Sequence, residues 1–327
     1  MGVIIDSPDW TTSITVGDTI GLTAWLTASD MPAKISGAAC VIYNGYWYSV
    51  GGLANGFPTN ASFVAPINPD ASVGAWASSS NLPVTLTNAV AIAYNSFLYL
   101  IGGSVNGVES NTVYYAPITA GGGLGAWNTS TVLPTTLLAV SAVVVNGNLY
   151  LIGGAHGGVQ VNTVYVSPIS TAGPIGVWTT LTALPYTRNG AGAFTYGNRI
   201  FVVGGTGTLP LTTSGPASSV LSAPVNADGT IGAWAEQTSL PEPRSLPVVV
   251  LTGNTLYFIG GLIGATSYAS VFATKINADG TINQWQRAAD LPLPLYSAVG
   301  GAYNGAIYVA GGSANGVFVQ GTYYAVI

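Results

Sequence analysis

The chain has 327 residues, of which 49% are hydrophobic and only 5% are charged, and its formal net charge is −5 at pH 7. An ordinary globular protein carries roughly 25% charged residues, so this surface must be covered by small polar side chains, glycine and backbone. Six Lys and Arg residues do not provide the basic footprint that nucleic-acid binding requires. A single histidine and a single cysteine exclude a His/Cys metal cluster and an internal disulfide, so we expect neither a metal nor another cofactor.

A repeat of about 50 residues organises the whole chain. Six glycine pairs recur at spacings of 51, 51, 51, 56 and 51 residues, and a tryptophan stands 26 residues before each pair. Self-similarity at this period predicts a propeller, in which each unit is one four-stranded blade. The pairs are Gly51-Gly52, Gly102-Gly103, Gly153-Gly154, Gly204-Gly205, Gly260-Gly261 and Gly311-Gly312, and the tryptophans are Trp25, Trp76, Trp127, Trp178, Trp234 and Trp285.

Four strands can be placed in each repeat in chain order. A short apolar run of small residues, such as residues 89–94, suits an innermost strand. An Asn-Gly turn, as at Asn146-Gly147, then predicts a hairpin, because a type I′ turn needs positive φ at both positions. The second strand ends at the glycine pair, a third strand follows, and the tryptophan lies on the outermost strand. The spacing of 56 residues reflects a five-residue insertion between Thr206 and Ser219.

The double glycine, the third-strand aromatic, the late tryptophan and the Leu-Pro that follows it together resemble the kelch repeat. The resemblance implies an all-β fold, a six-bladed β-propeller of kelch type, with tryptophans wedged between blades. We expect residues 16–327 to form this ring, closed by the N-terminal strand around Trp25, which completes the last blade as its outer strand. Residues 1–15 have no counterpart in the repeat and are expected to form an N-terminal arm. Arginine, which many kelch repeats carry three residues after the proline, occurs here only as Arg188 and Arg244.

One polar cluster is a candidate ligand site. In a kelch ring, the loops after the outer strand and those after the glycine pairs open on the same face, where guanidinium groups could hold a carboxylate and tyrosines could stack on a sugar. Alternatively, the arginines and the glutamate simply pair with one another. His156 is either a solvated loop residue or a ligand contact. The candidate ligand-binding residues are Arg188, Glu242, Arg244, Tyr186, Tyr296 and His156.

The sequence indicates an exposed setting. Asn60 and Asn128 begin glycosylation sequons, although the composition makes chance matches expected. No run of about 20 apolar residues predicts a membrane span, and no signal peptide is recognisable near the start. With so little charge, we expect the protein outside a cell, on a cell surface or on a virion, where its partners would be other subunits of a surface assembly and glycans.

Three functions are compatible with these observations. The first is a non-enzymatic surface module for attachment or assembly, the expectation that the missing catalytic constellation favours. The second is a sugar-processing enzyme like the six-bladed sialic-acid mutarotases, in which Arg188, Glu242 and Arg244 would serve acid/base ring opening. The third is an intracellular adaptor of the kelch kind. Because propellers host unrelated functions, the fold alone does not choose among them.

Overall fold

The structure is a computed structural model that describes residues 21–209 and 212–327. The expected arm, residues 1–15, lies outside the described residues. Throughout the described part the regular structure consists of β-strands, so the all-β prediction is confirmed. The predicted Asn-Gly hairpin turns are present as well: at Asn146-Gly147, for example, φ is 50° and 76°.

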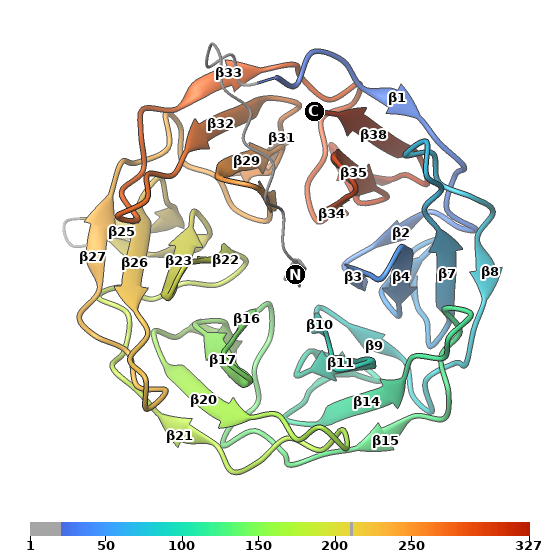
Figure 1. The fold of residues 1–327 in the computed structure, drawn as a ribbon, viewed down its shortest axis with the longest axis horizontal. Coiled ribbons are helices and arrows are strands. Elements are labelled where there is room, and N and C mark those ends of the chain that lie inside the picture. Colours follow the sequence, from blue (N-terminus) through green and yellow to red (C-terminus); the bar gives the residue numbers. More distant parts are fainter. Residues whose placement is uncertain (1–20, 210–211) are drawn as a thin grey trace.

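Six four-stranded antiparallel sheets in the described residues are arranged radially around a central axis (Figure 1). We number them one to six by their inner strands in chain order, and in each the order from the axis outwards is inner, second, third and outer strand. The inner strands are β3 (Ala39–Tyr43), β10 (Val90–Tyr94), β16 (Ser141–Val145), β22 (Gly192–Tyr196), β28 (Val248–Thr252) and β34 (Val299–Tyr303). The second strands are β4 (Tyr46–Val50), β11 (Phe97–Ile101), β17 (Asn148–Ile152), β23 (Arg199–Val203), β29 (Thr255–Ile259) and β35 (Ala306–Ala310). The third strands are β7 (Ser62–Pro66), β14 (Val113–Pro117), β20 (Val164–Pro168), β26 (Val220–Pro224), β32 (Val271–Lys275) and β38 (Thr322–Val326). The outer strands are β8 (Ala77–Ser78), β15 (Asn128–Thr129), β21 (Thr179–Thr180), β27 (Ala235–Gln237), β33 (Gln286–Ala288) and β1 (Leu26–Thr27).

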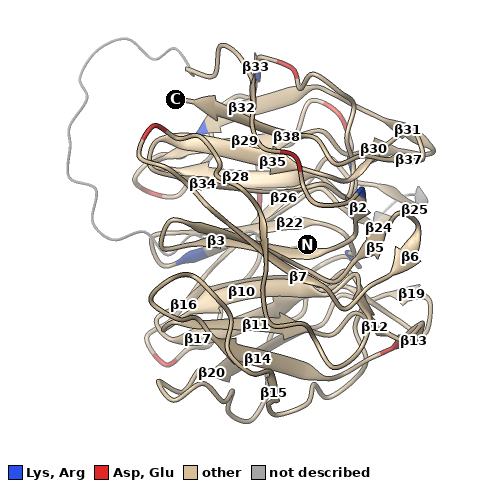
Figure 2. Ribbon diagram, turned by 90° about the vertical axis from the view of Figure 1, so that its right-hand side faces the viewer, with Lys and Arg blue, Asp and Glu red and all other residues tan. Residues whose placement is uncertain are grey.

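Short hairpins between the second and third strands project on one side of the sheets, which we call the hairpin face (Figure 2). The opposite side, the turn face, carries the Asn-Gly turns and the turns between third and outer strands. The five-residue insertion lengthens the fourth hairpin. The hairpin strands are β5 (Leu53–Ala54) with β6 (Phe57–Pro58), β12 (Ser104–Val105) with β13 (Val108–Glu109), β18 (Ala155–His156) with β19 (Val159–Gln160), β24 (Thr206–Leu209) with β25 (Thr212–Pro216), β30 (Leu262–Ile263) with β31 (Thr266–Ser267), and β36 (Ser313–Ala314) with β37 (Val317–Phe318). Two further strands, β2 (Ile35–Ser36) and β9 (Leu86–Thr87), pair with β5 and β12.

The hydrophobic core lies between neighbouring sheets and not within any one of them. One cluster, for example, joins Val41 and Tyr48 of the first sheet to Ala91 and Leu98 of the second. Both faces of each inner and second strand are therefore buried, which explains why these strands read as continuous apolar runs and do not alternate.

Each glycine pair binds the neighbouring sheet through its backbone. The second glycine donates its N–H to a carbonyl three residues after the next proline of the repeat, as from Gly52 to Leu86 and from Gly312 to Ile35. All six such N···O distances lie between 2.6 and 2.8 Å. A Cβ on the first glycine would overlap that same carbonyl oxygen, at 2.5 Å for Gly102. The pair is required because only glycine lets the two backbones approach this closely.

The tryptophans join the sheets at the outer edge. Each indole Nε1 donates to a backbone carbonyl of the preceding repeat, at 2.7 to 3.3 Å. For Trp25 the acceptor is Ala289, 264 residues later in the chain. Strand β1 pairs with β38 through Leu26↔Tyr324 and Thr27↔Tyr323, and Leu22 is buried in the core between the fifth and sixth sheets.

A ring of hydrogen bonds surrounds the axis on the hairpin face. Six residues, one before each inner strand, donate their backbone N–H to the carbonyl of the equivalent residue in the preceding sheet, at 2.9 to 3.4 Å. All six have left-handed backbone, with φ between 48° and 63°. We call these residues the collar: Gly37, Asn88, Ala139, Gly190, Leu246 and Ser297. Four of the six are not glycine, so the hydrogen bonds around the ring hold them in a conformation that costs energy locally.

The first prediction concerns β1. Removing residues 1–30 deletes Leu22, Trp25 and β1, exposes the edge of β38, and loses burial that stabilises the fold by about 3 kcal/mol. We expect the thermal midpoint to fall by roughly 5 °C or more and aggregation to increase. Removing residues 1–20 is the control, because it keeps every contact described above. Equal melting of the two truncated proteins by circular dichroism would contradict the role assigned to β1.

The second prediction concerns the collar. Ala139→Val places a β-branched residue at φ 48° and should lower the free energy of unfolding by about 1 to 2 kcal/mol. Ala139→Asn, which copies the residue at the equivalent position 88, should be neutral or slightly stabilising. Urea unfolding measures both, and equal stability of the two variants would show that the collar backbone is not strained.

Candidate functional site

The two arginines expected at a mouth are instead buried between sheets. Arg188 is 1% exposed and Arg244 is 0% exposed. Their carbonyls are the acceptors for Gly154 and Gly205, so the backbone at this position is held against the preceding sheet and the side chain turns inwards. The equivalent residues of the other repeats are equally buried and apolar: Ile35, Leu86, Leu137 and Leu295. The expectation that Arg188 and Arg244 line an open mouth is therefore corrected.

Each arginine has a serine acceptor in its own sheet. Arg244 Nη1 donates to Ser270 Oγ at 2.8 Å and its guanidinium lies 3.8 Å from the centre of the Tyr268 ring. Arg188 Nη2 donates to Ser219 Oγ. Ser219 and Ser270 occupy equivalent positions, and the sheets without the arginine carry Ala61, Thr112, Thr163 and Gly321 there. Burial lowers the pKa of both guanidinium groups. These contacts indicate a packing role.

Two of the other predicted residues each lie against one arginine: Glu242 against Arg244, and Tyr186 against Arg188, whose guanidinium is 5.8 Å from the centre of the Tyr186 ring. Glu242 pairs with Arg244, as the alternative interpretation expected, while its own side chain is 45% exposed. The Tyr186 hydroxyl donates to Glu236 Oε1 at 3.2 Å. Tyr296 is half-buried and its backbone pairs with Ser313 at the start of the sixth sheet. His156 lies in the third hairpin, on β18.

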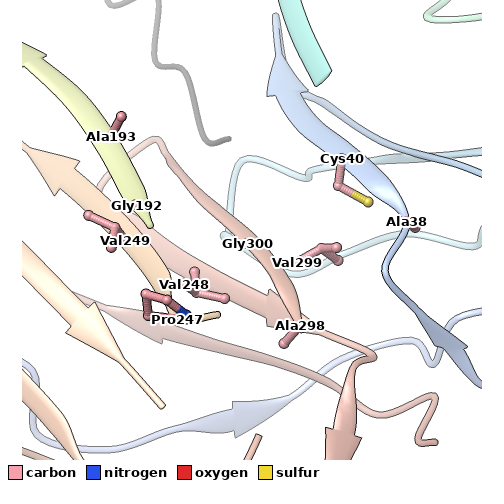
Figure 3. A pocket seen from close by; sticks show the side chains of 10 residues that line it. All are labelled: Ala38, Cys40, Gly192, Ala193, Pro247, Val248, Val249, Ala298, Val299 and Gly300. Atoms are coloured by element: carbon pink, nitrogen blue, oxygen red, sulfur yellow. The ribbon is translucent and has the colours of Figure 1, made fainter. Parts of the chain in front are cut away.

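A small apolar cavity lies between the inner strands near the axis. Its walls come from the start of the inner strands β3, β22, β28 and β34, and Cys40 is among them (Figure 3). The cavity volume of about 20 Å³ admits a water molecule and not a sugar. Cys40 is buried as expected, and burial raises the pKa of its thiol to about 12.

An acid/base pair lies on the hairpin face between the second and third sheets. His156 Nδ1 is 2.7 Å from Thr136 Oγ1, 3.0 Å from Thr135 Oγ1 and 4.0 Å from Glu109 Oε2. Glu109 accepts hydrogen bonds from the N–H groups of Gly157 and Gly158, at 2.8 and 3.2 Å, and from Thr136 at 3.0 Å. The side chains of His156 and Glu109 are 52% and 24% exposed.

The electrostatics keep the Glu109 carboxylate ionised. The Gly157 N–H, followed by Thr136, Gly158 and His156, holds the pKa of Glu109 below its ordinary value. All three contacts of His156 involve Nδ1, and no hydrogen-bond partner meets Nε2 within residues 21–209 and 212–327. Nε2 can therefore accept a proton from a ligand or donate one to it. Exposed Val108 and Val159 lie on the same two hairpins and provide apolar surface beside the pair.

Glu109 was missed by the sequence analysis, although the repeat contained a signal. In two repeats the residue seven positions after the first glycine of a pair contacts the hairpin of the next sheet: Glu109 binds Gly157 and Gly158, and Ser267 Oγ donates to Asn315 Oδ1 at 2.8 Å. Aligning the hairpins of successive repeats would have placed Glu109 beside the single histidine.

The two sequons differ in their surroundings. Asn60 Nδ2 donates to the carbonyl of Leu82 at 2.9 Å, a contact repeated by Asn111 and Asn162 in the next two sheets. Asn128 is exposed on β15. No helix capable of crossing a bilayer occurs in the described residues.

Comparison with known proteins places the repeat among kelch sequences. No family model matches the chain. It is 25% identical over 257 residues to Kelch-like protein terF of Aspergillus terreus, covering 73% of this chain and 52% of that protein. It is 33% identical over 147 residues to human Kelch-like protein 34, covering 42% of this chain and 21% of that protein, and 27% identical over 169 residues to Kelch repeat protein M-T8 of Myxoma virus, covering 50% and 30%. The chain thus spans about half the length of the first relative and less of the others.

Among solved structures, the chain resembles YjhT with a TM-score of 0.72 and 14% identity, over 90% of this chain and 95% of that one. YjhT corrects the main functional expectation, because it favours the alternative of a sialic-acid-mutarotase-like enzyme over a non-enzymatic surface or attachment module. At this identity the likeness establishes the fold, and the reaction is taken up below as a proposal.

The third prediction tests the packing role of the arginines. Replacing a buried charge with a hydrophobic side chain of similar volume is often neutral or stabilising, and leucine already occupies this position in three repeats. We expect Arg188→Leu and Arg244→Leu to change the free energy of unfolding by about 1 kcal/mol or less, or to raise it. Arg188→Ala, the control that leaves a cavity, should lower it by about 2 to 4 kcal/mol. A loss of more than about 2 kcal/mol for Arg188→Leu in urea unfolding would show that the guanidinium itself is needed.

Several independent observations define the family. The glycine pairs bind the next sheet, the tryptophans bind the preceding one, and the curated relatives from a fungus, a human and a virus share the kelch name. The chain belongs to the kelch-repeat propeller family.

Proposed function

We propose that the protein processes a sugar, as a sialic-acid-mutarotase-like enzyme, with His156 as the proton-transferring group and Glu109 as its partner. The observation that carries the proposal is the pair itself: an imidazole and an ionised carboxylate 4.0 Å apart on an accessible face. This position differs from the one expected from the sequence, because Arg188 and Arg244 are buried and occupied by internal contacts.

The chemistry of mutarotation suits such a pair. Ring opening removes the proton of the anomeric hydroxyl and adds one to the ring oxygen, and closure on the other face of the carbonyl reverses both transfers. In this proposal His156 Nε2 takes the anomeric proton and returns it on closure, while solvent at the exposed site exchanges the proton of the ring oxygen. Glu109, held in place by two backbone N–H groups and Thr136, stabilises the imidazolium that forms.

We also infer that the six sheets act as six blades of one closed ring that holds this site rigid. Three kinds of contact support the inference: the collar hydrogen bond from Gly37 to Ser297, the glycine contact from Gly312 to Ile35, and the indole contact from Trp25 to Ala289. Each of these contacts links residues near the start of the described chain to residues near its end. Each has the same form as the contacts between sheets that are consecutive in the chain.

The fourth prediction is an NMR assay of anomerisation with N-acetylneuraminic acid. We expect the wild-type protein to accelerate exchange between the anomers, and His156→Gln to reduce this acceleration by about 100-fold or more, the usual contribution of a positioned general base. Glu109→Gln should reduce it less, because Glu109 acts through the imidazole. Ser267→Ala, at the equivalent hairpin position of the fifth sheet, is the control and should keep the wild-type rate.

Two results would contradict this proposal. A wild-type protein that does not accelerate anomerisation would remove the enzymatic function for this substrate. Loss of the rate in Glu242→Gln with full activity in His156→Gln would place the chemistry at Arg244 and not at the second and third hairpins.

A further inference from the structure

A recess on the turn face lies at the junction between the third and fourth sheets. At five junctions the turn that follows a third strand packs against the preceding sheet near the beginning of its second strand. At four of them a glycine in that turn meets the side chain there. Between the sixth and first sheets the second strand begins with Ala306, and the Tyr308 hydroxyl donates to the Ala71 carbonyl at 2.9 Å.

Three described junctions are filled by large side chains. Between the first and second sheets, a Cβ on Gly122 would overlap the ring of Tyr46. Between the second and third sheets, a Cβ on Gly173 would lie 2.6 Å from Tyr115 and 3.0 Å from Phe97. Between the fourth and fifth sheets, Gly280 lies against the Arg199 side chain, which a Cβ would approach to 2.6 Å.

The third and fourth sheets meet differently. The residue equivalent to Tyr46 and Phe97 is Asn148, whose Nδ2 would lie 3.4 Å from a Cβ on Gly229. The residue equivalent to Tyr115 is the smaller Val166. A cavity of about 200 Å³ remains here, far larger than the space of one water molecule.

The lining of the recess is apolar on one side and polar on the other. Val166 and Leu181 are half-buried, whereas Asp228 and Thr179 are exposed at its edge, opposite Asn148. Asp228 Oδ1 accepts hydrogen bonds from the Thr230 N–H and hydroxyl, at 2.9 and 2.7 Å, which hold the pKa of the carboxyl below its ordinary value. Neither Thr230 contact uses Oδ2. The recess thus combines apolar surface, a fixed carboxylate and a primary amide.

We propose that this recess binds a neutral, hydroxyl-rich sugar. The C–H face of a pyranose ring packs on Val166 and Leu181, its hydroxyls donate to Asp228 Oδ2, and the Asn148 amide both donates and accepts. The Asp228 carboxylate repels acidic sugars, so this ligand class differs from the substrate proposed for His156. The inference does not depend on the proposed enzymatic function, because the two sites lie on opposite faces and share no residue.

The fifth prediction uses ligand-observed NMR and calorimetric titration with galactose and N-acetylglucosamine as probes. We expect at least one probe to bind the wild-type protein. Asn148→Tyr copies residue 46 of the first sheet and should fill the recess, reducing affinity more than tenfold while leaving the thermal midpoint unchanged. Asp228→Asn should reduce affinity on the order of tenfold, because a hydrogen bond to a charged acceptor is lost.

A matched control separates the recess from the turn itself. Asp279→Asn alters the equivalent turn, whose junction Arg199 fills, and should leave sugar binding unchanged. Failure of both probes to bind the wild-type protein, or equal binding by the wild type and Asn148→Tyr, would overturn the proposal. Asn148→Tyr should keep the anomerisation rate and His156→Gln should keep galactose binding, so the two proposals fail separately.

Discussion

The hydrogen bond from each glycine pair to the next sheet is the contact on which the rest of the structure depends. The first glycine lies against a backbone carbonyl where no Cβ fits, and the second donates its N–H to the same oxygen. This contact sets the distance between neighbouring sheets. Once that distance is set, the core residues of adjacent sheets interdigitate, the collar residues reach one another near the axis, and the indoles reach the preceding repeat. The fold is therefore built from contacts between repeats, and no sheet buries both of its faces alone.

These contacts also explain how a chain with 5% charged residues can be stable. Most junctions are joined by backbone groups and by uncharged side chains, since even the Tyr99, Tyr150 and Tyr308 hydroxyls donate to turn carbonyls of the next sheet. Arg188 and Arg244 are exceptions, because each places a charged group between the sheets, where burial removes it from water. Each occupies a position where other repeats have leucine or isoleucine, and each donates to a serine hydroxyl of its own sheet.

Both proposed sites arise where one repeat departs from the others. His156 and Glu109 replace the neutral residues of other hairpins, and the contact of Glu109 with the Gly157 N–H has an uncharged equivalent in the contact of Ser267 with the Asn315 N–H. Asn148 stands where the first and second sheets have Tyr46 and Phe97, and a recess lies beside it. In a molecule made of near-identical units, the regular positions serve the fold and the irregular ones are available for function.

The sequence by itself determined the period, the strand order within a repeat, the Asn-Gly turns and the tryptophan positions, because these depend on local conformation and on spacing along the chain. It did not reveal that Arg188 and Arg244 are buried, since their burial follows from contacts with residues distant in the chain: the glycine pair of the preceding sheet, which holds each carbonyl, and a serine that accepts from each guanidinium. Nor did it place Glu109 beside His156, 47 positions away, or leave room at Asn148. The expectation that the two arginines line an open mouth was wrong for this reason. Which side chains meet was decided by the distance and rotation between neighbouring sheets, and these are properties of the tertiary structure.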